Sequence, residues 1–280
     1  MSDLKKRTIT AIVLIALITP VVFFGKIFMV IFAGLLSIGA TYELEKMFKK
    51  DDKWDSRRIA NIVLSALSYV VIYYSIFLKE YMYIGFYLLL MFLYFGALMI
   101  FDKRMNIHNL GNSLLSIFYP ALGFSSLALI RNIETGLYRE GLFVLIYAVL
   151  ICMCTDMFAY FFGCKFGKHK LAPTISPKKS IEGSIAGTAF SVVIPPVFAI
   201  LTNVHKVLFP NVQDVWAILL VILFSLVLSV IDEIGDLFAS KLKREYEIKD
   251  YSQIFPGHGG ILDRFDSYIF VGVCVLIILI

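Results

Sequence analysis

Long apolar stretches alternate with short polar ones along the whole chain, and the apolar stretches lead to the first prediction. A helix that crosses the hydrocarbon core of a bilayer needs about 20 mostly apolar residues. Nine stretches approach or reach that length, namely 8–24, 27–42, 59–78, 81–101, 110–130, 142–163, 184–204, 216–237 and 265–280. This pattern predicts an all-α polytopic membrane protein with about nine transmembrane helices.

The composition supports a membrane protein and argues against a soluble one. Hydrophobic residues make up 59% of the 280 residues and charged residues only 17%, against roughly 25% charged residues in soluble domains. No polar stretch is long enough to form a separate soluble domain. We therefore expect one integral membrane domain over residues 1–280. Its first five helices lie in 1–141, and its last four helices lie in 142–280 with most of the polar motifs.

The positions of Lys and Arg predict the orientation of this domain. If the N-terminus is cytoplasmic, 21 of the 26 Lys and Arg residues fall in the N-terminal tail or in cytoplasmic loops, and five fall in outside loops. Membrane proteins keep Lys and Arg in their cytoplasmic loops. We therefore expect a cytoplasmic N-terminus and an outside C-terminus. The loops at 164–183 and 238–264 then share the cytoplasmic face.

The four cysteines do not form a recognisable metal or disulfide pattern. They are Cys152, Cys154, Cys164 and Cys274, and all but Cys164 lie within apolar stretches. The chain has no CxxC pair and no Cys/His cluster, so a zinc site or a disulfide framework is not expected. Buried small hydrophobic side chains are the better interpretation.

Polar groups first gather at the end of the sixth apolar stretch, in TDMFAYFFGCKFGKHKLAPTISPKKSIEGS (155–184). Asp156 is a carboxylate at membrane depth, which costs about 2.5–3.5 kcal/mol at a helix centre and normally faces the bundle interior or a water-filled cavity. In the loop, hydroxyl and ammonium groups of SPKKSIEG suit a polyphosphate; they belong to Ser176, Lys178, Lys179 and Ser180. A purely topological role for this basic loop, in contact with anionic headgroups, stays open.

A second group ends the eighth apolar stretch, in SVIDEIGDLFASKLKREYEIKD. Asp232 and Asp236 are four residues apart and share one face of the predicted helix, whereas Glu233 lies to one side. Ser240 follows one turn later on that face, and Lys243 and Arg244 come next. A helix end that simply reaches water would also carry such charges. The density of acids within an apolar run, however, favours a functional site over a solvated helix end.

The third group, GHGGILDRFDS, precedes the last apolar stretch. Asp263 and Asp266 are three residues apart, so both carboxylates face the same way on a helix. Together with Asp236 they suit Mg²⁺, which takes hard oxygen ligands and keeps waters and substrate phosphates. A turn formed by Pro256, Gly257, Gly259 and Gly260 exposes N–H groups before a helix start, an arrangement typical of anion sites. Arg264 suits a phosphate. An interfacial turn with an Asp cap remains the alternative.

The segment SKLKREYEIKDYSQIFPGHGGILDRFD, from Ser240 to Asp266, resembles the signature of the phosphatidate cytidylyltransferases, or CDP-diacylglycerol synthases. The chain fills every fixed position of that pattern: Ser240, Lys243, Arg244, Lys249, Asp250, Ser252, Pro256, His258, Gly259, Gly260, Asp263, Arg264 and Asp266. GDLFAS, ISPKKSIEG and DMFAYFFG also look like the family. The likeness of motifs covers about Asp156 to Asp266, and Glu233 with Ile234 departs from the less acidic run that the family shows there.

The resemblance implies transfer of a cytidylyl group from CTP to phosphatidic acid, which gives CDP-diacylglycerol and pyrophosphate. It implies Mg²⁺ as the required ion, with a second cation left open, and Asp236, Asp263 and Asp266 as its ligands. The catalytic residues it implies are these three with Lys243 and Arg264. The residues it implies for binding CTP and phosphate are Ser176, Lys178, Lys179, Ser180, Arg244, Lys249, His258, Gly259 and Gly260. Supporting residues without a defined role are Asp156, Asp232 and Asp250.

The expected setting is the cell (inner) membrane, crossed many times, with the active site facing the cytoplasm. The expected partners are CTP, phosphatidic acid and membrane lipids, with no nucleic acid and with a homodimer left open. Two other functions stay under consideration. A CTP-dependent lipid-alcohol kinase would release CDP instead of pyrophosphate. An ion-coupled transporter would line a path with Asp156, Asp232 and Asp236, although such a path usually needs charges near mid-membrane, and here the polar groups gather at one end.

Overall fold

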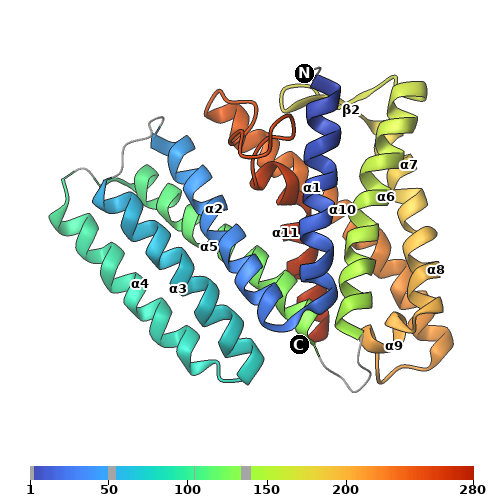
Figure 1. Ribbon diagram of the computed structural model, residues 1–280, viewed down its shortest axis with the longest axis horizontal. Helices are drawn as coiled ribbons and strands as arrows, with labels where there is room; N and C mark the ends of the chain where they lie inside the picture. The colour runs from blue at the N-terminus through green and yellow to red at the C-terminus, as the bar shows by residue number, and fades with distance from the viewer. Residues whose placement is uncertain (1–2, 50–54, 104, 134–139) are drawn as a thin grey trace.

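The computed structural model describes residues 3–49, 55–103, 105–133 and 140–280, and this part of the chain is almost entirely helical (Figure 1). It forms eleven helices and one two-stranded antiparallel sheet. Before the sheet come α1 (Asp3–Phe24), α2 (Lys26–Lys49), α3 (Ser56–Leu78), α4 (Met82–Phe101), α5 (Ile107–Asn132) and α6 (Glu140–Phe166). The sheet and the remaining helices are β1 (Lys170–Ala172), β2 (Ser176–Ser180), α7 (Ile181–Ser191), α8 (Ile194–Leu201), α9 (Val204–Leu208), α10 (Asp214–Glu245) and α11 (Leu262–Leu279).

Seven of the nine predicted spans coincide with helical stretches that are long and apolar enough to cross a membrane, which confirms a multi-pass all-α protein. They are α2, α3, α4, α5, α6, the stretch Ile181–Leu201 and α10. The first predicted span falls in α1, whose apolar part Thr8–Phe24 is shorter. The last falls in α11, whose first turns carry Asp263, Arg264 and Asp266. A total of nine crossings therefore stays a prediction.

The seventh predicted span, 184–204, is a broken helix in the structure and not a continuous one. Helix α7 ends at Ser191, and α8 begins at Ile194 with Pro195 and Pro196 in its first turn. Proline has no N–H to donate and its ring clashes with the preceding turn, so a helix start suits it better than a helix interior, although Pro20 in α1 and Pro120 in α5 do lie inside helices. Pro195 and Pro196 therefore place the break, which the apolar pattern alone does not reveal.

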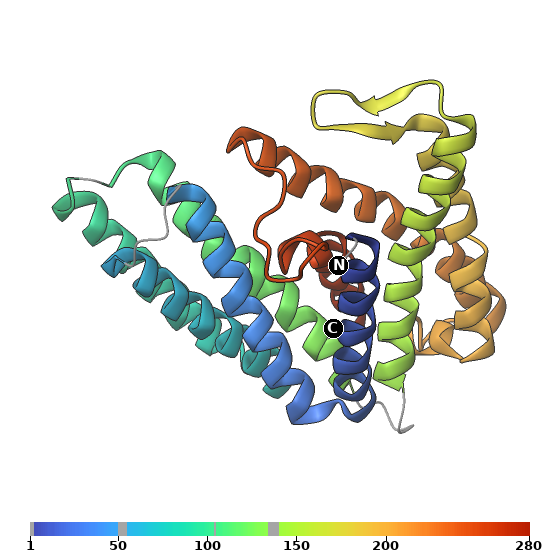
Figure 2. The same cartoon turned by 45° about the horizontal axis from the view of Figure 1, so that its top comes forward.

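The helices form two groups with α1 and α11 between them (Figures 1 and 2). Helices α2 to α5 pack together on one side, and α6 to α10 pack together on the other. Helix α11 contacts α5, α6 and α10, so it joins the two groups. The β1–β2 hairpin, the end of α10 and the start of α1 lie at one end of the molecule, and the C-terminus lies at the other (Figure 1).

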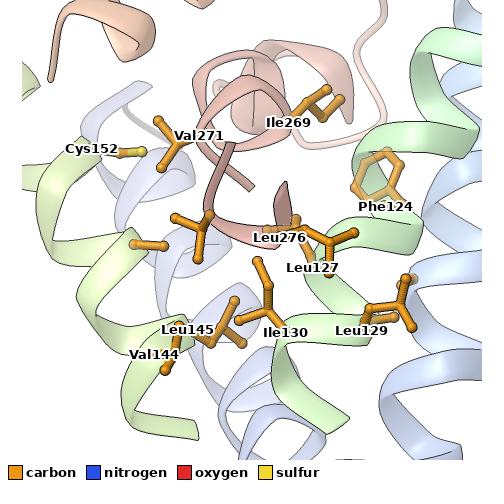
Figure 3. Packing of buried hydrophobic residues seen from close by; sticks show 14 of the residues in the cluster. Phe124, Leu127, Leu129, Ile130, Val144, Leu145, Cys152, Ile269, Val271 and Leu276 are labelled. Atoms are coloured by element: carbon orange, nitrogen blue, oxygen red, sulfur yellow. The ribbon is translucent and has the colours of Figure 1, made fainter. Parts of the chain in front are cut away.

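A buried apolar cluster fixes α11 in this central place (Figure 3). Val271 of α11 lies beside Cys152 of α6, and Ile269 of α11 lies on the side of Phe124 of α5 (Figure 3); all four are at most 2% exposed. The four cysteines are free; Cys152 and Cys154 are buried as expected, whereas Cys164 is exposed. Because α11 is held tightly along its length, the charged residues at its start have a defined position relative to α5, α6 and α10.

The orientation in the membrane can be checked with tags. We expect a tag at the N-terminus to face the cytoplasm and a tag at the C-terminus to face outside, because 21 of the 26 Lys and Arg residues fall in the predicted cytoplasmic segments and such segments retain positive charge. Protease treatment of sealed vesicles measures which tag is accessible. Two tags on the same side would contradict an odd number of crossings.

Candidate active site

The strand β2 carries two adjacent lysines whose side chains have different surroundings. Lys178 is exposed, whereas the Nζ of Lys179 lies 2.6 Å from Asp236 Oδ2 on α10. Neighbouring side chains on a strand point to opposite faces, so only Lys179 faces the helices. Burial disfavours the charged form of Lys179, but the Asp236 carboxylate outweighs this effect and raises the pKa of the lysine. Lys179 is therefore a fixed positive charge beside α10.

Ser180 and the glycines that follow it join the hairpin closely to α6. The Ser180 side chain is buried and accepts a hydrogen bond from the N–H of Gly183 at 3.2 Å, which caps α7. A Cβ atom at Gly187 would lie 2.5 Å from the carbonyl oxygen of Thr155, so only glycine fits there. Gly183 and Gly187 therefore allow α7 to pack closely against α6. Ser180 keeps its O–H as a donor, and Ser176 pairs with Ala172 in the sheet.

Four aspartates from three helices converge near Lys179. Asp156 of α6 lies within electrostatic reach of Asp236, Glu233, Lys179 and Arg264. Asp266 of α11 is similarly influenced by Asp236, Lys243 and Asp156. Asp232 is fully buried beside the Cys152 thiol, and neither of its carboxylate oxygens accepts a hydrogen bond that meets the usual distance and angle criteria. The structure thus brings together the predicted acids at 156, 232, 236 and 266.

Asp263 has a different environment from Asp266, although the two were predicted to act alike. Its side chain is only 5% exposed, and its Oδ1 lies 2.7 Å from the Nζ of Lys243. Its Oδ2 accepts hydrogen bonds from the N–H groups of Tyr251 at 2.8 Å and Gly260 at 2.9 Å. These three donors use most of the roughly four lone pairs of a carboxylate. Asp263 therefore ties the end of α10 to the loop before α11.

The glycine turn before α11 has the tight geometry that the sequence predicted. Gly257 and Gly259 have φ angles of 79° and 87°, which favour glycine. The N–H groups of the turn, however, already have partners within the protein. Gly260 donates to Asp263, and the next two N–H groups, of Ile261 and Leu262, donate to Glu43 at 2.8 and 3.0 Å. These three donors are already used within the protein in this structure, and the predictions for Gly259 and Gly260 stay untested.

Glu43 is a residue of this site that sequence reasoning missed. It lies on α2, is fully buried, and also accepts a hydrogen bond of 2.5 Å from the hydroxyl of Ser252. The predicted second span stopped at residue 42, so Glu43 was counted as part of a polar loop. The available signal was its helical context, because α2 continues to Lys49 and carries two acids, Glu43 and Glu45, beside an apolar run.

The remaining predicted residues lie around this centre and are mostly exposed. Arg264 donates from Nε to the carbonyl of His258 at 2.6 Å, and Arg244 donates to the carbonyls of Ile175 and Ile248 at 3.4 and 3.2 Å. Each arginine donates to backbone carbonyls of a loop. Each also has further N–H groups that could donate to a substrate, since a guanidinium has five. Lys249 and Asp250 are exposed in the loop after α10.

The donor set suits a hard cation only in part. Among the residues that the structure describes, no three His, Cys, Asp or Glu side chains are close enough to hold a metal ion by themselves. Mg²⁺ needs only one or two carboxylates when waters and substrate phosphates complete its shell. Asp236 and Asp266 are partly exposed, so their oxygens could serve as such ligands. Asp263 has less capacity for a cation, because Lys243 and two backbone N–H groups already use three of its roughly four lone pairs.

Comparison with known proteins agrees with this arrangement. The model of the cytidylyltransferase family matches residues 5–280. A phosphatidate cytidylyltransferase of Staphylococcus epidermidis is 33% identical over 274 residues, and one of Staphylococcus haemolyticus is 33% identical over 279 residues. Each alignment covers 96% of this chain and 96% of the relative. The resemblance of the signature segment is thereby confirmed over nearly the whole chain, which belongs to the cytidylyltransferase family.

Proposed function

We propose that this protein transfers the cytidylyl group of CTP to phosphatidic acid, giving CDP-diacylglycerol and pyrophosphate. The relatives at 33% identity are named for this activity. The observation in the structure that carries the proposal is the convergence of Lys179, Asp156, Asp236 and Asp266 at one end of a membrane-spanning bundle. A site at the end of such a bundle is where a lipid in the bilayer and a nucleotide in water can meet.

The proposed chemistry requires cations more than a base. A phosphate oxygen of phosphatidic acid attacks the α-phosphorus of CTP, a new P–O bond forms, and the bond to the pyrophosphate breaks. The attacking group already carries negative charge, so no strong base is needed, and catalysis rests on positioning and on stabilising the charge of the leaving group. Lys179, Lys243 and Arg264 act on the acidic cluster, and Lys178 of β2, Arg244 near the end of α10 and Lys249 in the following loop are exposed.

We propose Mg²⁺ as the ion, held by Asp236 and Asp266 with Asp156 beside them. Their oxygens fit a hard cation that keeps waters and phosphates, and the cluster of negative charge needs a counter-charge beyond Lys179. When bound, the ion would neutralise phosphate charge and orient the two substrates. In this proposal Asp263 orders the loop, and Lys243 is held by Asp263.

We place the site on the cytoplasmic face of the cell membrane. The hairpin, the end of α10 and the start of α1 share one end of the molecule (Figure 1), and the Lys-rich segments predicted to be cytoplasmic include the hairpin. CTP is then supplied from the cytoplasm.

The decisive experiment uses purified protein in detergent with labelled CTP and phosphatidic acid. We expect a labelled CDP-lipid and pyrophosphate in equal amounts, and only when a divalent cation is present. Release of CDP with a lipid alcohol as the acceptor would instead indicate a lipid kinase. No turnover of CTP with either acceptor, under conditions where the protein is folded, would refute the proposed function.

A further inference from the structure

The start of α11 has the form of an anion site that is filled by a residue of the protein. The N–H groups of Ile261 and Leu262 converge on the Glu43 carboxylate at 2.8 and 3.0 Å, and the Ser252 hydroxyl donates to it at 2.5 Å. A helix N-terminus exposes N–H groups and carries a partial positive charge, which favours an anion. Here a carboxylate from α2 takes the place that a bound phosphate occupies in other proteins.

The Glu43 carboxylate lies so close to Gly260 that no side chain fits at this position. A Cβ atom at Gly260 would lie 2.3 Å from Glu43 Oε1 and 2.7 Å from the Ser252 hydroxyl oxygen. Any other residue at this position would therefore displace either the carboxylate or the loop. Gly260 also donates its N–H to Asp263, so Glu43 and Asp263 hold consecutive N–H groups of the same turn.

Glu43 is joined through this turn to groups that the proposed reaction uses. Asp263 holds the Nζ of Lys243 at 2.7 Å, Arg264 donates to the carbonyl of His258 in the turn, and Asp266 lies one helical turn after Asp263. Glu43 itself is fully buried, so it does not touch substrate from where it lies.

We propose that Glu43 is a positioning residue for the cytidylyl transfer: its carboxylate occupies the anion site at the start of α11 and fixes the loop between α10, which carries Lys243, and α11, which carries Arg264 and Asp266. The inference rests on the proposed function for its catalytic consequence. A second consequence is that Lys and Arg side chains, and not backbone N–H groups, bind the substrate phosphates. The N–H groups of Gly260, Ile261 and Leu262 already donate to carboxylates of the protein.

The main test is Glu43→Ala with and without added acetate, which has the atoms that the substitution removes beyond Cβ. We expect kcat to fall about 100-fold, as is typical when catalytic groups are misplaced by about 1 Å, with a much smaller change in the KM for CTP. Acetate should recover at least a tenth of the lost kcat. Acetamide, which has the same shape but no charge and one acceptor fewer, should recover none.

Glu45→Ala is the matched control, because Glu45 is a second buried carboxylate on α2 but lies in a separate network. It accepts hydrogen bonds from Asn61 at 2.8 Å and Ser116 at 2.6 Å and lies 3.6 Å from the Nζ of Lys49, and none of these partners belongs to the loop before α11. Its loss should lower the melting temperature while the folded protein keeps kcat within a few-fold. If Glu43→Ala fails to fold, Glu43→Gln, which keeps the size and one acceptor, replaces it and should show the same fall in kcat.

A second readout does not depend on turnover. Lys249 is exposed in the loop, and we expect a lysine-specific protease to cut after it faster in Glu43→Ala, with protection restored by acetate and not by acetamide. Wild-type kcat in Glu43→Gln, equal rescue by acetamide, or the same acetate response in Glu45→Ala would overturn the inference. A wild-type protein that makes no CDP-lipid but shows acetate-dependent protection in Glu43→Ala would refute the proposed function and leave the role of Glu43 standing.

Discussion

Replacement of Asp263 by Asn is expected to abolish turnover and to lower the melting temperature, whereas Asp266→Asn is expected to reduce turnover alone. Asp263 is 5% exposed and holds Lys243 and two backbone N–H groups. Removal of one partner from a buried ion pair costs about 3–5 kcal/mol. Asp266 accepts only from the N–H of Ser267 at 3.0 Å among the hydrogen bonds described here, so its loss should cost little stability but about 10²–10³ in rate.

A double variant separates the two roles of Asp263. Asp263→Asn combined with Lys243→Met removes both charges of the pair, and such a replacement is often neutral for stability. The melting temperature should return toward that of the wild type, while turnover stays low. Melting temperatures in detergent and turnover against Mg²⁺ concentration measure both effects. Equal melting temperatures for the two single Asn variants would contradict the structural distinction between the aspartates.

The second large effect is expected for Lys179→Ala. Its Nζ lies 2.6 Å from Asp236, so the substitution removes a cation from a cluster in which Asp156, Asp236 and Asp266 already repel one another. We expect kcat/KM for CTP to fall about 10²–10³-fold, the loss that is typical for one well-placed electrostatic group. Lys178→Ala is the matched control, because this neighbour is exposed on the opposite face of β2.

For the control, a fall in kcat/KM of less than about tenfold is expected, since an exposed charge is screened by water and salt. The comparison requires that both variants melt near the wild-type temperature. A Lys178→Ala variant that loses as much activity as Lys179→Ala would mean that the whole basic loop, and not one inward lysine, serves the nucleotide.

The helical architecture and the clustering of the acidic side chains could be predicted from the sequence, because both depend on local sequence patterns. Seven helices follow from apolar length, and Asp232 and Asp236 share a helix face because they are four residues apart. The break after Ser191 was missed because proline and isoleucine count alike in an apolar stretch, although only proline lacks a donor.

The roles of individual carboxylates were not accessible, because they depend on partners far away in the chain. Asp263 and Asp266 look alike in DRFD, and only the fold shows that Lys243 and the Tyr251 and Gly260 N–H groups converge on Asp263. The start of α11 has the form of an anion site, but the backbone donors to its carboxylate are the N–H groups of Ile261 and Leu262 and not those of the predicted glycines. Its occupant, Glu43, lies more than 200 residues earlier, where no local pattern connects it to the turn.

The hydrogen bonds to Glu43 also have a consequence for how the protein is made. Their donors lie 209, 218 and 219 positions later in the chain. A chain is synthesised from its N-terminus, so α2 reaches the membrane before those donors exist. Until the ribosome has added the loop and the start of α11, Glu43 lacks the groups that compensate a buried carboxylate. A chain that ends before Ser252 has Glu43 but none of these three donors. An unfinished molecule therefore differs from a finished one in carrying a carboxylate on α2 without its hydrogen-bond partners.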